Sequence, residues 1–327
     1  MRKIVVDIYG ADDGIEPVVK GVAKALKAGL DFFPVLVGQA SAIFPLMEEA
    51  GIPAEGYEVI DTCDYIRQND PPHCIFGGRD ESSMAMAYGR LKADPDCFAM
   101  LSPGSTGALL VGSICRLGLL PGLKFPALAS ALPCGYEHLV CLVDCGANMD
   151  CTSDDLVRFA KMGEVLSRSV CGIERPRVGL MSVGREPQKG TALTKEAFEK
   201  IKTLPINFIG NLEGGDLVSG YADVVVCDGY AGNLLLKCAE AAGKRAMEIV
   251  DAAGVGADPE VRQQIKHALW KTFDFNSQGG ATFLGPKKTV VKMHGCANED
   301  TTVSSIEQIL RLEKAGFASA IAAVMRP

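Results

Sequence analysis

The chain of 327 residues lacks any run of eighteen or more consecutive apolar residues. A helix that crosses a bilayer needs about that length, so we expect no transmembrane helix. The N-terminus also lacks the long apolar core of a secretion signal, because Met1-Arg2-Lys3 is followed by only three apolar residues before Asp7. We interpret this start as a first strand and predict a cytoplasmic protein. The formal net charge of −7 leaves no excess of positive charge, which argues against a general nucleic-acid binder.

Metal-binding spacings are missing as well, although the chain has 12 cysteines. Cys141, Cys145 and Cys151 cluster, but their spacing fits no zinc motif and no pair of histidines lies nearby. Other cysteines fall inside apolar runs, which is typical of reduced, buried thiols in a chain without a secretion signal. We therefore expect no metal and no disulfide framework.

Three common catalytic motifs are absent. The first predicted strand is followed by Gly-Ala-Asp-Asp-Gly at 10–14, not by the G-x-G-x-x-G of a dinucleotide site. The loop Ser102-Pro103-Gly104-Ser105-Thr106-Gly107-Ala108 lacks the Gly-Lys-Ser/Thr ending of a Walker loop. A G-x-S-x-G elbow of serine hydrolases occurs nowhere.

What the sequence does contain is a repeated pairing of a short apolar run with a glycine-rich polar loop. The runs at 97–101, 139–143, 178–183 and 224–227 lead into SPGSTGA, DCGAN, GREPQKG and DGYAGN. Such runs suit strands of a parallel sheet buried on both faces, and ligands gather beyond the carboxyl ends of these strands. Because free N–H groups at helix starts attract anions, the pattern predicts one anionic small-molecule site built from several loops.

Strand and helix signals alternate along the chain, which is typical of an α/β fold. We predict further strands at 3–7 and 32–37 and a long mobile loop at Asn69–Arg79. Helices are predicted at 15–28, 43–50, 81–93, 107–117, 153–170, 191–203, 233–252, 258–271 and 303–323. Residues 233–271 form two consecutive helices with no strand between them, so this helical hairpin either covers a sheet face or projects and contacts a second copy; we favour the dimer contact.

Several loop residues have both a structural and a chemical interpretation. Ser105 or Thr106 could cap a helix or help to hold a phosphate. Lys189 is predicted near a helix N-terminus, where a cation is unfavourable unless an anion lies between them, although a solvated lysine is the ordinary alternative. Asn233 is by default the N-cap of its helix and alternatively a donor to an oxyanion, and Asn148 has the same ambiguity. His294 is either an acid–base group or a structural histidine.

Together these loops resemble the PlsX family, the phosphate acyltransferases of bacterial phospholipid synthesis. The resemblance spans essentially the whole chain. Its motifs are SPGSTGALL, VDCGANMDC, RVGLMSVG, KGTALTKEA, NFIGNLEGGD, ADVVVCDGYAGNLLLK, GGATFLG and HGCAN. The resemblance implies transfer of a long acyl group from acyl carrier protein to inorganic phosphate, within fatty acid and phospholipid metabolism. It also implies one α/β domain over 1–327 that is related to phosphotransacetylases, with a parallel or mixed sheet between helices, usually a homodimer and without cofactor.

The resemblance also implies roles for individual residues. Lys189 and Asn233 match the family's catalytic lysine and asparagine, so we expect Lys189 to orient phosphate and Asn233 to stabilise the tetrahedral oxyanion. Because phosphate is itself a nucleophile, we expect direct transfer without an acyl-enzyme. The predicted substrate-binding residues are Asp7, Gly10, Asp12, Gly104, Ser105, Thr106, Gly107, Asn148, Gly232, Gly279, Gly280 and His294.

The chain departs from the family pattern in several places, including the loops Arg185–Gln188 and Gln278–Gly285. The opening D-A-M-G-G-D appears as Asp7-Ile8-Tyr9-Gly10-Ala11-Asp12, and a basic run is replaced by Gly78-Arg79-Asp80. The hairpin tip carries Asp251, Asp258 and Glu260, which anionic lipid would repel, so we expect at most weak, peripheral membrane contact. Two alternatives stay open, a phosphotransacylase that uses short acyl-CoA and a non-catalytic regulatory homologue that binds the acyl carrier.

Overall fold

The computed structural model describes residues 2–134, 138–253, 258–273 and 278–326. Contacts divide the chain into two compact units, and each is described by itself. Unit 1 comprises Met1–Pro126 and Gly279–Pro327, and unit 2 comprises Ala127–Gln278. The predicted single domain over 1–327 stays a prediction.

Unit 1 has a mixed sheet whose strands run in the order β3-β2-β1-β4-β11-β10. Its strands are β1 (Lys3–Asp7), β2 (Phe33–Gly38), β3 (Glu58–Asp61), β4 (Cys97–Ser102), β10 (Ala281–Leu284) and β11 (Thr289–Lys292). Its helices are α1 (Glu16–Lys27), α2 (Ala40–Glu49), α3 (Ser83–Ala93), α4 (Thr106–Gly112), α9 (Glu299–Lys314) and α10 (Phe317–Val324). All neighbours are parallel except β10, which is antiparallel to β11. The carboxyl ends of β1, β2, β3 and β4 therefore meet at one edge.

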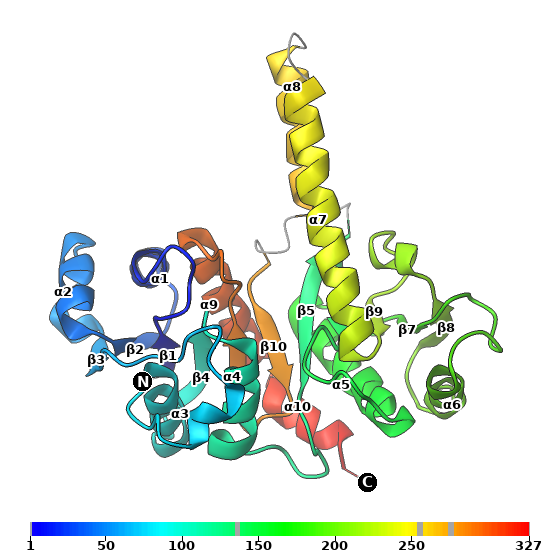
Figure 1. Cartoon of the computed structure of the whole chain (residues 1–327), viewed down its shortest axis with the longest axis horizontal. Coiled ribbons are helices and arrows are strands. Elements are labelled where there is room, and N and C mark those ends of the chain that lie inside the picture. The colour runs from blue at the N-terminus through cyan, green and yellow to red at the C-terminus, as the bar shows by residue number, and fades with distance from the viewer. Residues whose placement is uncertain (1, 135–137, 254–257, 274–277, 327) are drawn as a thin grey trace. The chain divides into compact units, whose positions relative to one another are not determined.

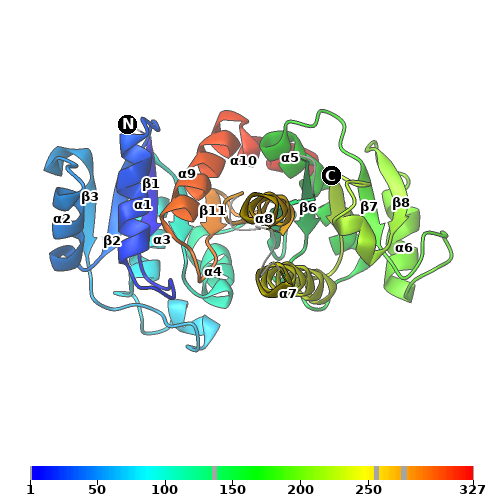
Figure 2. The same cartoon turned by 90° about the horizontal axis from the view of Figure 1, so that it is seen from above.

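Helix α1 illustrates why the apolar pattern produces this unit. Val18, Val19 and Val22 recur at helical spacing and are all fully buried. Gly21 lies on the same helix at its contact with α9, where a Cβ atom would come within 2.4 Å of the Thr302 side chain. The glycine thus allows the two helices to lie side by side, as Figure 2 shows.

Unit 2 has a sheet in the order β5-β6-β9-β7-β8. Its strands are β5 (Ala127–Pro133), β6 (Leu139–Val143), β7 (Val178–Met181), β8 (Phe208–Leu212) and β9 (Val224–Val226). Its helices are α5 (Ser153–Cys171), α6 (Ala192–Ile201), α7 (Gly229–Ala253) and α8 (Pro259–Phe273). Strands β6, β9, β7 and β8 are parallel neighbours and β5 is antiparallel to β6. The apolar runs at 139–143, 178–183 and 224–227 are thus confirmed as the parallel strands β6, β7 and β9, and the run at 97–101 is confirmed as the parallel strand β4 of unit 1.

The predicted helical hairpin is present. Helices α7 and α8 pack along each other and extend away from the strands of unit 2 (Figure 1). Gly243 permits the close approach, because its missing Cβ would lie 2.4 Å from Phe273. The predicted tip lies partly outside the described residues. Among the helices that the structure describes, none is long and apolar enough to cross a membrane.

Four differences from the predictions involve whole turns or breaks of helices. The single helix expected at 303–323 is two helices, because Gly316 adopts a left-handed conformation with φ +63° between α9 and α10. The predicted loop 69–79 contains a short 3-10 helix at Pro72–Phe76. Helix α2 begins at Ala40 and keeps Pro45 inside it. Helix α7 begins at Gly229, four residues earlier than predicted.

Candidate active site

The loop that carries Lys189 follows β7 in unit 2 and leads into α6. Thr191 caps α6, because its hydroxyl accepts from the Thr194 backbone N–H at 3.2 Å. The backbone N–H of Lys189 donates to the Glu186 carbonyl oxygen at 3.0 Å and closes a turn immediately before that helix. The exposed Lys189 side chain therefore stands beside the helix N-terminus, where an anion would be stabilised by both.

Two cations flank this loop, and their surroundings differ. The Arg185 guanidinium donates to Asp216 at 2.6 Å and lies over the Tyr221 ring at 4.6 Å from its centre. By contrast, no carboxylate among the described residues lies within ion-pair distance of the Lys189 ammonium. Arg185 is thus neutralised within the protein, and Lys189 keeps its charge for a ligand.

The loop after β6 is organised around its own carboxylate. Asp144 is fully buried, and one of its oxygens accepts from the backbone N–H groups of Gly146 and Ala147, both at 2.9 Å. The other accepts from the backbone N–H and the side-chain amide of Asn148 at 2.8 and 2.7 Å. Burial raises the pKa of Asp144, and these donors lower it in part. The N–H groups of this loop therefore already hold an internal anion, a role that the sequence interpretation missed.

Asn233 is not the N-cap of its helix, so that default interpretation was wrong. The Asp228 carboxylate accepts from the Ala231 N–H at 2.8 Å and caps α7, which places Asn233 one turn inside the helix. Its exposed side chain lies beside Gly146, whose missing Cβ would be 3.6 Å from the Asn233 Oδ1 atom. Within the described residues the Asn233 amide has no hydrogen-bond partner, so it is available to a ligand.

Gly232 explains how Asn233 reaches this position. A Cβ atom on Gly232 would lie only 1.8 Å from the Asp144 carbonyl oxygen, so any side chain would push α7 off the loop. Close packing of α7 on the Asp144 loop thus brings Asn233 next to Gly146. This contact gives Gly232 a packing role; its predicted contact with substrate stays a prediction.

In unit 1 the structure brings together loops at the carboxyl ends of β1 and β4. The buried Asp7 carboxylate accepts from the Ser102 hydroxyl at 2.7 Å, and the Gly104 N–H donates to the same Ser102 oxygen at 3.0 Å. Gly10 touches Gly104 directly, since its missing Cβ would lie 2.6 Å from the Gly104 Cα. These two glycines therefore serve close packing of two backbones. The Gln68 amide, which the sequence interpretation did not single out, donates to the Gly10 and Pro103 carbonyls.

The remaining predicted residues of unit 1 lie at its loops and helix starts. The Asp12 N–H donates to the Gly295 carbonyl at 2.7 Å, which joins the His294 loop to the Gly10 loop. Ser105 occupies the N-cap position of α4 but its side chain forms no capping hydrogen bond, and Thr106 begins the helix.

The other predicted glycines of unit 1 contact protein atoms. Gly107 lies against Pro72, and Gly279 and Gly280 lie against Gln308 and Lys292, with the Gly280 N–H donating to the Gln308 amide oxygen.

Burial of Asp7 predicts a pH-dependent stability. Desolvation raises the pKa of this carboxyl to about 6, from 3.8, despite hydrogen bonds that lower it. The folded state thus holds the proton more tightly than the unfolded state, and this stabilisation is present below about pH 4 and is lost as the pH rises through 6. We expect Asp7→Asn, which stays neutral, to raise the free energy of unfolding by about 2–3 kcal/mol at pH 8.

Urea unfolding of both proteins at pH 5 and pH 8 measures this difference. The gain from Asp7→Asn should be about half as large at pH 5 as at pH 8, and the exposed Asp13→Asn should show no gain at either pH. An equal gain at both pH values would contradict titration of Asp7 in this range.

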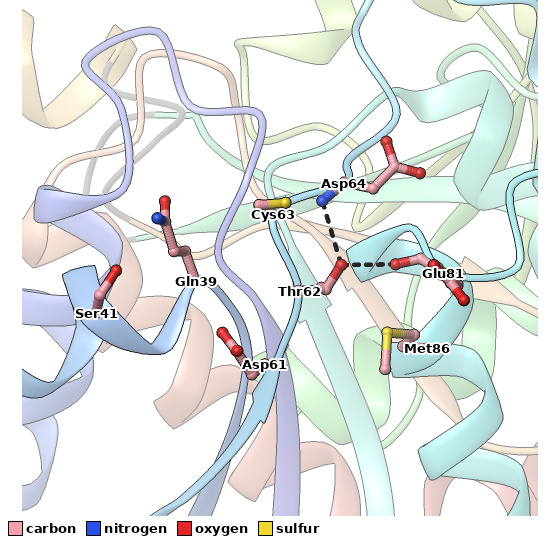
Figure 3. A pocket seen from close by; sticks show the side chains of 8 residues that line it. All are labelled: Gln39, Ser41, Asp61, Thr62, Cys63, Asp64, Glu81 and Met86. Atoms are coloured by element: carbon pink, nitrogen blue, oxygen red, sulfur yellow. Dashed lines mark hydrogen bonds between the residues drawn. The ribbon is translucent and has the colours of Figure 1, made fainter.

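A cavity of about 600 Å³ opens in unit 1 beyond the ends of β2 and β3. Figure 3 shows Thr62 between Asp64 and Glu81, with its hydroxyl hydrogen-bonded to the backbone of both. The lining residues are Gln39, Ser41, Asp61, Thr62, Cys63, Asp64, Glu81 and Met86. Three of them are acidic, so this cavity disfavours a phosphate dianion.

Comparison with known proteins identifies the relatives of this chain. A family model described as "Fatty acid synthesis protein" matches residues 2–320. The chain belongs to this family. Curated relatives named phosphate acyltransferase include one from Clostridium acetobutylicum, 34% identical with 93% of each chain covered. Another, from Thermoanaerobacterium thermosaccharolyticum, is 36% identical with 94% of this chain and 91% of the relative covered. Both support the predicted membership of the phosphate acyltransferase family.

Solved structures confirm the predicted phosphotransacetylase-like fold. A phosphotransacetylase from Streptococcus pyogenes superposes with a TM-score of 0.64 at 17% identity, covering 95% of this chain and 94% of that chain. A branched-chain phosphotransacylase from Enterococcus faecalis gives 0.62 at 15% identity, with 95% and 98% covered. At such low identity the likeness establishes the fold alone.

Proposed function

We propose that this protein of the fatty acid synthesis family transfers a long acyl group from acyl carrier protein to inorganic phosphate. The observation that carries the proposal is the Lys189 ammonium, exposed at a helix N-terminus with no carboxylate partner among the described residues, in a chain whose curated relatives are named phosphate acyltransferases. A phosphate dianion suits this combination of a cation and free helix N–H groups.

The reaction needs one bond formed and one broken. A phosphate oxygen attacks the thioester carbonyl, and the tetrahedral intermediate then collapses and expels the carrier thiolate, which leaves acyl phosphate. Lys189 orients the attacking phosphate and offsets its charge, and the Asn233 amide donates to the oxyanion. Holding two reactants in place can lower the barrier by on the order of 7 kcal/mol or more. No step requires a nucleophilic serine or cysteine of the protein.

The proposal also includes how the protein assembles and where it acts. The hairpin bears apolar side chains that are about half exposed, namely Leu234, Ile249, Val261 and Ile265. Burying them against a second copy would remove this apolar surface from water, which supports a homodimer contact through α7 and α8. We propose that the whole chain is one catalytic domain, that it acts in the cytoplasm, and that membrane contact is weak and peripheral.

The decisive assay follows phosphate-dependent consumption of palmitoyl-carrier protein by the purified protein, with short acyl-CoA as the competing donor. We expect turnover with the carrier protein and formation of acyl phosphate. Turnover with acyl-CoA alone would favour the short-chain phosphotransacylase, and binding of the carrier without turnover would favour a regulatory homologue. A covalent acyl adduct of the protein, detected by mass spectrometry, would contradict direct transfer.

A further inference from the structure

The segment Asn211–Asp216 contacts the Lys189 loop at two points. Asn211, the fourth residue of β8, donates from its side-chain amide to the Glu186 carbonyl oxygen at 2.9 Å. Asp216 holds Arg185, as described above, and is itself fixed because its second oxygen accepts from the Glu213 N–H at 2.9 Å. Both anchors thus come from one short stretch that includes the end of the neighbouring strand β8 and the residues just after it.

The Glu186 carbonyl oxygen links Asn211 to the turn at Glu186–Lys189, here called the lysine turn. It accepts from the Asn211 amide and also from the backbone N–H of Lys189 at 3.0 Å. A carbonyl oxygen can bond only to a donor, so the nitrogen of the Asn211 amide must face it. The position of this one oxygen therefore sets where the turn closes and where the Lys189 side chain leaves the backbone.

The surroundings of Asn211 indicate that its buried side-chain amide is there to hold the Lys189 loop in place. The side chain is only 4% exposed, and its Oδ1 atom has no partner among the described residues. Burying an amide costs free energy, whereas burying a well-packed apolar side chain does not. The one observed hydrogen bond of the Asn211 side chain is made to the turn that precedes Lys189 and not to a neighbouring strand. The turn also closes tightly, because Gly190 has φ +108° and its missing Cβ would lie 2.8 Å from the Ser182 hydroxyl.

We infer that Asn211 is a positioning residue for phosphate, acting through the Glu186 carbonyl to fix Lys189. This inference rests on the proposed function, in which Lys189 orients phosphate. Asn211 itself touches no substrate in this scheme. Loss of its hydrogen bond should therefore weaken the use of phosphate and leave the use of the acyl donor unchanged.

Steady-state kinetics of Asn211→Leu tests the inference, because leucine is close to asparagine in size and cannot donate. We expect kcat/KM for phosphate to fall about ten-fold, which corresponds to about 1.4 kcal/mol, while the KM for palmitoyl-carrier protein changes less than about two-fold. The matched control is Asn207→Leu, at the residue just before β8, where the amide donates to the Arg175 carbonyl at 3.5 Å. It should leave both constants unchanged.

A double-mutant cycle separates positioning from a general loss of structure. In the Lys189→Ala background, Asn211→Leu should change the residual kcat/KM for phosphate by less than about two-fold. An equal ten-fold loss in both backgrounds, or no loss in either, would overturn the inference.

If Asn211→Leu fails to fold by circular dichroism, the isosteric Asn211→Asp is tested in its place, with the same expected loss. If Lys189→Ala leaves phosphate use intact, the proposed role of Lys189 fails; if it impairs phosphate use and Asn211 variants do not, this inference alone fails.

Discussion

Lys189→Ala should lower kcat/KM for phosphate by on the order of 10³-fold. The substitution removes the only side-chain cation on this loop that lacks a carboxylate partner among the described residues. Arg185 does not replace it, because Asp216 and the Tyr221 ring hold its guanidinium. The bound phosphate would then keep only the helix N–H groups, which attract it but do not fix its orientation.

The measurement is initial velocity against phosphate concentration at saturating palmitoyl-carrier protein. Lys195→Ala, an exposed lysine one turn into α6, is the matched control and should retain full activity. Lys189→Arg should recover part of the loss, since it keeps the charge but changes its geometry. Because the Lys189 side chain is exposed, its removal should leave the melting temperature unchanged. Phosphate saturation at wild-type concentrations in Lys189→Ala would contradict the proposed role.

Asn233→Ala should lower kcat by about 10²–10³-fold, the range typical for loss of one oxyanion donor. The Asn233 amide lies beside Gly146 without a partner among the described residues, so its removal breaks no internal bond. A donor that acts on the transition state changes kcat and kcat/KM together, and the KM for phosphate should change less than about three-fold. This pattern distinguishes Asn233 from Lys189.

Asn233→Asp sharpens the test. The carboxylate has the same shape as the amide but offers no donor and adds negative charge near the developing oxyanion, so its kcat should fall at least as far as that of Asn233→Ala. Lys244→Ala, at an exposed position further along α7, should have little effect. Activity of Asn233→Asp close to wild type would exclude oxyanion stabilisation by this residue.

Much of the fold could be predicted from local patterns. The four apolar runs became β4, β6, β7 and β9, because a strand buried on both faces must be apolar along its whole length. The loops that end those strands follow directly, and with them the placement of Lys189 before α6 and of the hairpin after β9. Where the local signal was ambiguous it misled: Asn233 resembled an N-cap, yet Asp228 caps α7.

The chemistry of the loops could not be predicted in the same way. Asp144 and Asp228 both follow a buried strand, and sequence alone does not say that the first fills its own loop while the second caps a helix. Similarly, Gly10 and Gly104 resemble ligand-binding glycines, but they meet each other because β1 and β4 are adjacent. Which strands lie next to each other in the sheet is decided by the tertiary fold, because β1 and β4 are far apart in the chain.

Arg185 and Lys189 show which features of the site depend on the sequence alone and which depend on the tertiary structure. The sequence was sufficient to place both cations on one loop beside a helix N-terminus, since that depends only on the strand–loop–helix order. Which of them is free to meet an anion depends on Asp216, which lies 31 residues from Arg185 along the chain. Asn211, 25 residues from Glu186, likewise reaches the lysine turn only because β8 pairs with β7. Electrostatic and hydrogen-bond partners act through distance in space, so only the packed sheet decides which charge is neutralised and which remains for the substrate.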